Sequence, residues 1–206
     1  MSANLKLLVG LGNPTGQYEK TRHNAGFWFL DEIASRYRLV FHQDQRFHGL
    51  SARLELDENT VFLLKPMTYM NRSGLSVGAM AKYFKIEPVE ILVAHDELDL
   101  MPGVVRLKRG GGHGGHNGLR DLMTHLGTAD FHRLRFGIGH PGDRAEVISF
   151  VLNPPSRDDG EIIGEAIAKA AANLPGLVSG KLDAVMNRLH VDPRREAKKR
   201  LTSVDS

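Results

Sequence analysis

Short apolar runs alternate along the chain with segments whose apolar residues recur every three or four positions. The runs predict strands at 5–11, 48–56, 60–66, 90–98, 104–108 and 133–139. The periodic segments predict helices at 24–38, 73–84, 161–174 and 181–189, and a further helix after His116-Asn117. Strands alternating with helices predict an α/β fold, with a mixed, partly parallel, twisted sheet flanked by helices on both faces.

Length and composition favour one domain. A chain of 206 residues with 41% hydrophobic residues can bury one sizeable core, so we expect a domain at 1–193 and a basic tail at 194–206 whose order the sequence leaves open. No apolar run reaches eighteen residues and no signal pattern opens the chain, so we expect a cytoplasmic protein without a membrane span. The absence of cysteine excludes disulfides, thiolate zinc sites and cysteine nucleophiles.

Basic residues cluster although the net charge is only +3. The tail contains RREAKKR at 194–200, and residues 102–120 contain no acid but carry four cations: Arg106, Lys108, Arg109 and Arg120. Such clusters are typical of proteins with a phosphate-rich partner. The alternative is an ordinary solvated surface.

A glycine pair, Gly10 and Gly12, follows the first predicted strand and raises the possibility of a dinucleotide fingerprint. The next glycine is Gly16, one position later than the G-x-G-x-x-G spacing requires, and the helix begins only near Asn24. The helix therefore starts too late to face a pyrophosphate as in that motif. A Walker-type phosphate loop is also missing from the sequence.

Polar residues follow several predicted strands or precede the helices after them. They are Asn13, His23, Asn71, Asp96, His116 and Asn117. Because open α/β sheets bind ligands at the carboxyl ends of their strands, we expect these side chains to converge. Taken alone, His23-Asn24 is also typical of a simple helix cap, so the convergence is more informative than any single motif.

Four segments carry distinctive motifs: GLGNPTGQYEKTRHNAGFWFLD, KPMTYMNRSG, HDELDLMPGVVRLKRGGGHGGHNGLRD and RLRFGIGHP. They closely resemble the bacterial peptidyl-tRNA hydrolases, and the resemblance extends from about residue 5 to residue 190. It implies a monomeric, metal-independent α/β esterase without a cofactor. Such an enzyme cleaves the ester bond between a peptide and the 3'-terminal ribose of tRNA, which frees the tRNA for reuse in translation after ribosome rescue.

The resemblance also implies residue roles. The catalytic histidine falls on His23 and its aspartate partner on Asp96, and substrate-holding asparagines fall on Asn13, Asn71 and Asn117. Tyr18 and Met70 would line the same crevice with His116 at its mouth, and Lys108 with Arg133 would belong to the face that binds tRNA.

The chemistry agrees with these residue types. An aminoacyl ester needs a positioned water, a base and stabilisation of one oxyanion. His23 suits the base because the ordinary pKa of histidine is about 6.5, and Asp96 would fix its tautomer. Asn13 and Asn71 would supply amide donors, whereas Asn117 would either hold the water or polarise the carbonyl; the sequence leaves both open.

The basic residues would contact phosphates of the acceptor arm and the CCA end. We expect Arg106, Lys108, Arg109 and Arg133 to do so without reading the base sequence. The alternative for Arg133 and Arg135 is a solvent-facing pattern, since the two arginines alternate with apolar residues along their strand.

Three other functions are weaker. His113 and His116 suggest a metal site but lack a third ligand of suitable spacing. A serine hydrolase would need a G-x-S-x-G elbow, which the sequence lacks, so attack by water is preferred. A non-catalytic RNA-binding protein would have the same basic surface but no need of His23 with Asp96.

Overall fold

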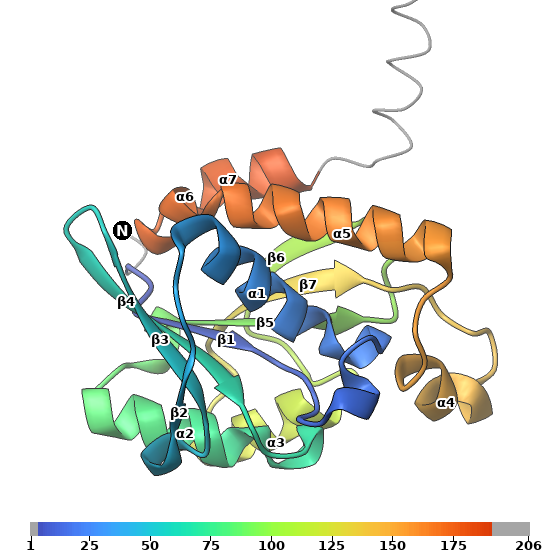
Figure 1. Cartoon of the computed structure of the whole chain (residues 1–206), viewed down its shortest axis with the longest axis horizontal. Helices are drawn as coiled ribbons and strands as arrows, with labels where there is room; N and C mark the ends of the chain where they lie inside the picture. The colour runs from blue at the N-terminus through green and yellow to red at the C-terminus, as the bar shows by residue number, and fades with distance from the viewer. Residues whose placement is uncertain (1–3, 191–206) are drawn as a thin grey trace, which may run out of the picture.

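One seven-stranded sheet crosses the molecule, with helices packed on both of its faces (Figure 1). The structure is a computed structural model that describes residues 4–190, so the predicted basic tail at 194–206 lies outside the described residues. In spatial order the strands are β2 (His42–Asp44), β3 (Gly49–Leu56), β4 (Asn59–Pro66), β1 (Leu7–Gly10), β5 (Ile91–Glu97), β7 (His132–Gly137) and β6 (Val105–Arg109). The predicted mixed α/β fold is confirmed.

The middle of the sheet is parallel. Strand β1 pairs in parallel with β4 and β5, and β5 pairs in parallel with β7, whereas the β2–β3, β3–β4 and β6–β7 pairs are antiparallel. The carboxyl ends of β4, β1, β5 and β7 therefore meet at one edge of the sheet. Of the polar residues predicted to converge, Asn13 and His23 follow β1, Asn71 follows β4, and Asp96 lies in β5. His116 and Asn117 follow the antiparallel β6, and the glycine-rich loop brings His116 to Asp96.

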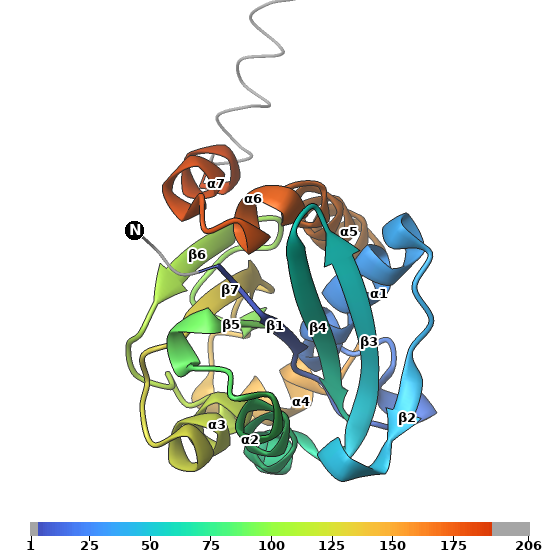
Figure 2. The ribbon, with the colours of Figure 1, turned by 90° about the vertical axis from the view of Figure 1, so that its left-hand side faces the viewer.

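Helices cover the two faces unequally. Figures 1 and 2 show α1 (Ala25–Tyr37), α5 (Arg157–Ala172), α6 (Leu174–Val178) and α7 (Leu182–Leu189) on one face, and α2 (Ser73–Phe84) and α3 (Asn117–Leu126) on the other. The short α4 (Val147–Val151) lies beyond the ends of β5 and β7 (Figure 1). Both faces of the central strands are consequently buried.

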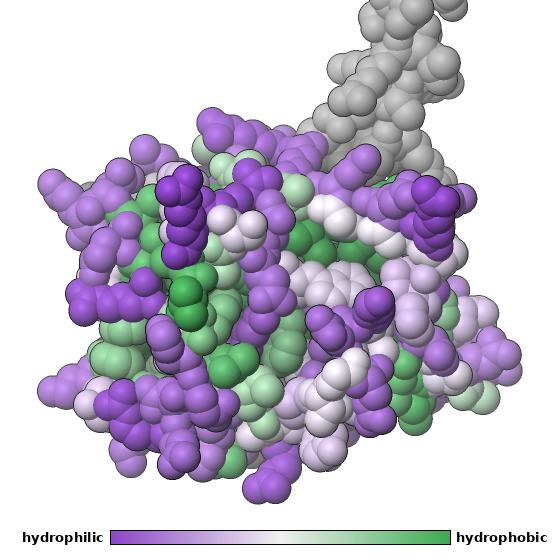
Figure 3. Space-filling model, in the orientation of Figure 1, coloured by the Kyte–Doolittle hydropathy of each residue, from purple (hydrophilic) through white to green (hydrophobic). Residues whose placement is uncertain are grey.

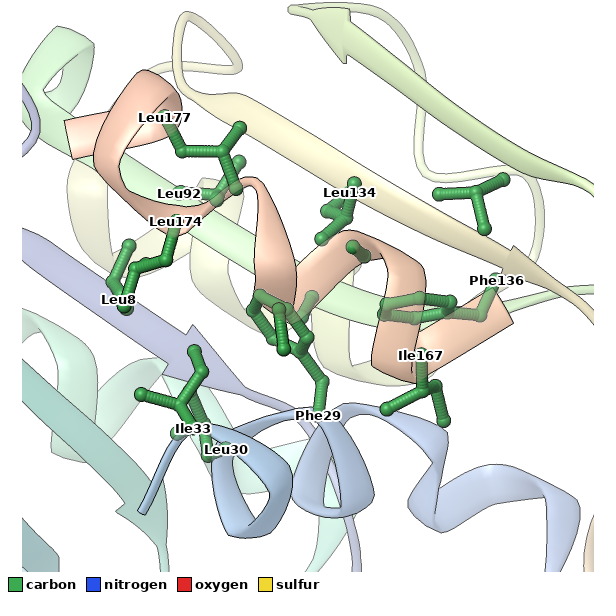
Figure 4. Packing of buried hydrophobic residues seen from close by; sticks show 14 of the residues in the cluster. Leu8, Phe29, Leu30, Ile33, Leu92, Leu134, Phe136, Ile167, Leu174 and Leu177 are labelled. Carbon is green, nitrogen blue, oxygen red and sulfur yellow. The ribbon is translucent and has the colours of Figure 1, made fainter. Parts of the chain in front are cut away.

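The core is divided by the sheet, and β1 contributes to both halves. Leu8 belongs to the cluster that includes Phe29 of α1 and Ile167 of α5 (Figure 4), whereas Leu7 and Val9 belong to the second apolar cluster, beneath α2 and α3. A strand covered on both faces explains the unbroken apolar run in the sequence. On the face shown in Figure 3, hydrophilic side chains cover much of the outer surface.

The first helix lies unusually close to the sheet because of Gly26. A Cβ atom at this position would lie 2.3 Å from the carbonyl oxygen of Ala94 in β5 and 2.4 Å from the amide nitrogen of Leu11. Only glycine permits this approach. The start of α1, with His23 directly before it, is thereby brought against the end of β5.

Candidate active site

A histidine and an aspartate distant in sequence form a hydrogen bond at the carboxyl edge of the sheet. Asp96 is the sixth residue of β5, and His23 lies in the 3-10 turn η2 (Arg22–Asn24) that leads into α1. Nδ1 of His23 lies 2.9 Å from Oδ1 and 3.0 Å from Oδ2 of Asp96. The Asp96 side chain is 2% exposed and that of His23 12% exposed. The carboxylate is therefore enclosed, while the imidazole keeps limited access to solvent.

A second histidine shares the same carboxylate. Nε2 of His116 lies 3.0 Å from Oδ1 of Asp96, and Nδ1 of His116 accepts the amide hydrogen of Leu119 at 3.3 Å, which caps α3. A ring nitrogen that accepts an amide hydrogen carries no proton, so His116 donates to Asp96 through Nε2. The rings of His23 and His116 lie 4.9 Å apart, both directed at Asp96.

These contacts move the pKa values of Asp96 and His23 in opposite directions. Burial alone would raise the pKa of Asp96, but the charges and hydrogen bonds of His23 and His116 outweigh it and hold this pKa below its ordinary value. Burial alone would lower the pKa of His23, but the charge and hydrogen bond of Asp96 outweigh it and raise this pKa. The aspartate is thus ionised, and His23 is a stronger base than a free histidine.

Asn13 is held on three sides. Its backbone N–H donates to Oδ1 of Asn24 at 2.9 Å, its carbonyl accepts from Nδ2 of Asn24 at 3.1 Å, and its own Oδ1 accepts the amide hydrogen of Met70 at 2.8 Å. This bond to Met70 fixes which end of the Asn13 amide is oxygen. Within residues 4–190 no hydrogen bond engages Nδ2 of Asn13, so this donor remains for a ligand.

The other predicted substrate-binding residues surround this group. Met70 is buried, and its sulfur packs against Gly118 in the first turn of α3. A Cβ atom at position 118 would lie 2.6 Å from this sulfur. Asn71 and Asn117 are exposed at the starts of helices, and Tyr18 is partly exposed in the turn η1 (Gly16–Tyr18). In the described part of the chain, no side-chain hydrogen bond joins Tyr18, Asn71 or Asn117 to the His23–Asp96 pair.

Comparison with known proteins identifies the family. Residues 7–200 match the family model described as peptidyl-tRNA hydrolase. The chain is 53% identical over 190 residues to the peptidyl-tRNA hydrolase of Neisseria gonorrhoeae, which covers 92% of this chain and 99% of the relative. It is 55% identical over 187 residues to that of Methylococcus capsulatus, which covers 91% and 100% of the two chains. The crystal structure of peptidyl-tRNA hydrolase from Acinetobacter baumannii superposes with a TM-score of 0.89 at 48% identity, covering 93% of this chain and 97% of that one.

The chain belongs to the peptidyl-tRNA hydrolase family. The resemblance inferred from the sequence is thereby confirmed, as is the conclusion that the protein is an enzyme.

The same three side chains are the group in residues 4–190 that could hold a metal ion. One ligand atom each from His23, Asp96 and His116 lies within 4.8 Å of the others. The hydrogen bonds to Asp96 account for this proximity without an ion, because a proton of each imidazole occupies the space between the ligand atoms. His113, which the sequence paired with His116, instead accepts the amide hydrogen of Gly115. None of the helices in residues 4–190 has the length and apolar character needed to cross a membrane.

The basic residues of this peptidyl-tRNA hydrolase family member lie on β6 and β7. Lys108 is partly exposed, and Arg109 is exposed but makes two hydrogen bonds to Asp130, at 2.6 and 2.7 Å. Arg106 stands opposite Arg135 on the neighbouring strand, and both are partly exposed. Arg106, Lys108 and Arg135 are therefore the partly exposed cations of this strand pair.

Arg133 departs from both interpretations of the sequence. Its side chain is buried, with a residue exposure of 2%, and its guanidinium donates to the carbonyl oxygens of Gly111 and Gly112 at 2.5 Å each. The solvent-facing pattern is therefore wrong for Arg133, and the direct phosphate contact expected from the resemblance does not fit this position. The alternation along the strand predicted an exposed side chain, but the glycine-rich loop folds over this end of the sheet and covers Arg133.

Two residues support the site in ways that the sequence did not indicate. Asn24 acts on the loop at Asn13 and makes no capping bond to α1, which corrects the interpretation as a helix cap. Arg22 donates to the carbonyls of Phe150, Asn153 and Pro154 at 3.1, 3.2 and 2.9 Å, and so ties the end of α4 and the residues after it to the turn that carries His23. Asn24 and Arg22 both lie in the TRHNAG motif beside His23, and this adjacency is the one signal in the sequence that could have pointed to them.

Proposed function

We propose that this chain hydrolyses the ester bond between a peptide and the 3'-terminal ribose of tRNA, with His23 as the general base, and releases tRNA for reuse in translation. The observation that carries the proposal is the bond of His23 Nδ1 to both oxygens of Asp96, at 2.9 and 3.0 Å. A proton fixed on Nδ1 leaves the lone pair of Nε2 free to accept a proton from water.

The aspartate would orient the base and would stay ionised throughout. When His23 takes a proton from the attacking water, the imidazolium forms beside the carboxylate, whose charge stabilises it. The low pKa of Asp96 means that the carboxylate does not compete for this proton. His116 would hold the carboxylate in place from the other side, at 3.0 Å.

The oxyanion needs donors that carry no negative charge. Nδ2 of Asn13 is suited to this role because Oδ1 is engaged by the amide of Met70, while no hydrogen bond in residues 4–190 engages the amino group. Asn71 and Asn117, exposed at helix starts on the same edge of the sheet, would bind the peptide and either the water or the ester carbonyl. Tyr18 and Met70 would line the crevice for the peptide.

The tRNA would lie across β6 and β7. Lys108 and Arg109, together with Arg106, would meet the phosphates of the acceptor arm, and the CCA end would reach the carboxyl edge of the sheet. Such contacts carry affinity without base specificity, which agrees with an enzyme that accepts many tRNAs. We further propose that the protein acts in the cytoplasm as a monomer, in ribosome rescue, and that the reaction needs neither metal nor cofactor.

The test is turnover of a peptidyl-tRNA by the wild-type protein and by His23→Ala. We expect the variant to lose at least about 10³-fold in rate while it binds the substrate with nearly unchanged affinity, because the base acts on the water and contributes little to tRNA binding. His125→Ala is a matched control, since this histidine lies at the end of α3 beside Asp121. Equal turnover by wild type and His23→Ala would instead support a non-catalytic RNA-binding protein on this scaffold.

A further inference from the structure

Arg133 is a buried cation without an acidic partner. The residue is 2% exposed, and within residues 4–190 no carboxylate lies at salt-bridge distance from it. Its guanidinium lies over the ring of Phe131, 4.8 Å from the ring centroid. Burial, followed by the charge of Arg135, lowers the pKa of Arg133. Burial of an unpaired charge carries a large desolvation penalty, and the hydrogen bonds of the guanidinium have to offset it.

Those hydrogen bonds are made to the glycine-rich loop. One terminal nitrogen of the guanidinium donates to the carbonyl of Gly112 and the other to that of Gly111, at 2.5 Å each. Among the described residues, Arg133 contributes the sole side chain from outside the loop that hydrogen-bonds to residues 110–115. The planar fork of an arginine can hold two adjacent carbonyls at once, which a lysine cannot do.

The loop needs such an anchor. Four of its glycines, Gly110, Gly111, Gly114 and Gly115, have positive φ angles, a conformation that leaves the backbone many alternatives when unrestrained. The loop ends at His116, whose Nε2 donates to Asp96 at 3.0 Å, and at Asn117, which begins α3. Displacement of residues 111 and 112 would therefore be transmitted to the donor that holds the catalytic carboxylate.

We infer that Arg133 is a positioning residue: it sets residues 110–115 so that His116 meets Asp96, and it makes no contact with tRNA. The inference rests on the proposed function for its catalytic readout. Positioning replaces the phosphate-binding role expected for Arg133, which is left to the partly exposed cations of β6 and β7. One of these is Lys108, which lies directly opposite Arg133 on β6.

Three variants separate positioning from phosphate contact. Arg133→Gln removes the charge and, because no buried charge is left, is expected to retain the fold. Arg133→Lys keeps the charge but cannot hold both carbonyls. Lys108→Gln is the matched control, since it removes one charge from the same side of the same strand pair. The measurements are kcat and KM for a peptidyl-tRNA, the dissociation constant and salt dependence for a peptide-free acceptor-arm hairpin, and amide exchange at residues 110–116.

We expect both Arg133 variants to lose about 10²-fold in kcat, as a misplacement of about 1 Å in a catalytic group does. Their affinity for the hairpin and its salt dependence should stay at the wild-type level, and exchange at residues 110–116 should accelerate. Lys108→Gln should weaken hairpin binding and reduce its salt slope by about one.

Three results would each overturn the inference. The first is wild-type kcat in Arg133→Lys, because it would show that charge alone suffices. The second is a loss of hairpin affinity and salt dependence in Arg133→Gln equal to that in Lys108→Gln. The third is unchanged amide exchange at residues 110–116 in folded Arg133→Gln. This third measurement does not depend on catalysis, whereas a wild-type protein that failed to hydrolyse peptidyl-tRNA would refute the proposed function separately.

Discussion

Replacement of Asp96 by asparagine preserves the shape of the side chain but removes its charge. In the wild-type protein, both oxygens of Asp96 lie within 3.0 Å of Nδ1 of His23, and Oδ1 also accepts from His116. An asparagine offers one acceptor, and its amino group would face an imidazole that donates. Either one hydrogen bond is lost, or His23 moves its proton to Nε2 and can no longer accept one from water.

The expected loss follows from the separation of the charges. At about 4 Å and an effective dielectric constant of about 20, a carboxylate stabilises an imidazolium by about 4 kcal/mol. A neutral hydrogen bond retained by the asparagine offsets about 1 kcal/mol of this. The remaining loss of about 3 kcal/mol corresponds to a fall of about 10²-fold in kcat.

The pH dependence gives a second, independent measure. The base must be neutral to act, so activity is lost as pH falls through the pKa of His23, which Asp96 raises above 6.5. In Asp96→Asn the carboxylate no longer raises the pKa of His23, whereas burial still lowers it. The acid limb of the kcat/KM profile should therefore move to a pH below 6.5. Both profiles are measured by release of peptide from peptidyl-tRNA between about pH 5 and pH 9.

Glu97→Gln serves as the control for this experiment. It neutralises the next residue of β5, whose carboxylate lies 3.6 Å from Arg135 and away from His23, so the acid limb should stay in its wild-type position. An acid limb unmoved in Asp96→Asn, or a kcat within about threefold of wild type, would show that the carboxylate does not support the base.

Three further predictions concern the support of the site. Asn24→Ala removes both hydrogen bonds to the backbone of Asn13 and should lower the free energy of unfolding by about 2 kcal/mol, together with a fall in kcat. Urea denaturation measures the stability, and an unchanged free energy of unfolding would contradict the role of Asn24. Gly26→Ala places a Cβ atom 2.3 Å from the carbonyl of Ala94 and should lower the melting temperature sharply, whereas Gly164→Ala on α5, where nothing lies within 4 Å, should be neutral or stabilising. Dialysis against a chelator should leave the hydrolysis rate unchanged; a rate restored only by added divalent metal would instead assign an ion to His23, Asp96 and His116.

The sequence predicted the main features of the sheet because its central strands are buried on both sides. An unbroken apolar run such as that around Leu7–Gly10 is distinctive, and the polar residues that end such runs converge when the strands are parallel. Strand β2 was not predicted, because His42–Asp44 is short and polar and pairs only with β3 at the edge of the sheet.

The contacts between loops could not be predicted from residue spacing. His116 was placed at the mouth of the crevice by resemblance, yet its bond to Asp96 depends on the path of a loop in which several glycines have positive φ angles. Arg133 follows the alternation of an exposed strand position and is buried by the same loop. Local pattern reports which face of a strand a residue occupies but not whether a distant segment covers that face.

The burial of Asp96 has a consequence for how the enzyme becomes competent during folding. The carboxylate is enclosed at the end of a central strand, and its two donors come from segments that reach it from opposite directions in the chain. A partly folded molecule that lacked either segment would contain an enclosed, insufficiently paired anion, an unfavourable state. The shared carboxylate therefore disfavours intermediates in which α1 or α3 has not docked, so that the His23–Asp96–His116 contacts also promote all-or-none completion of this edge of the sheet.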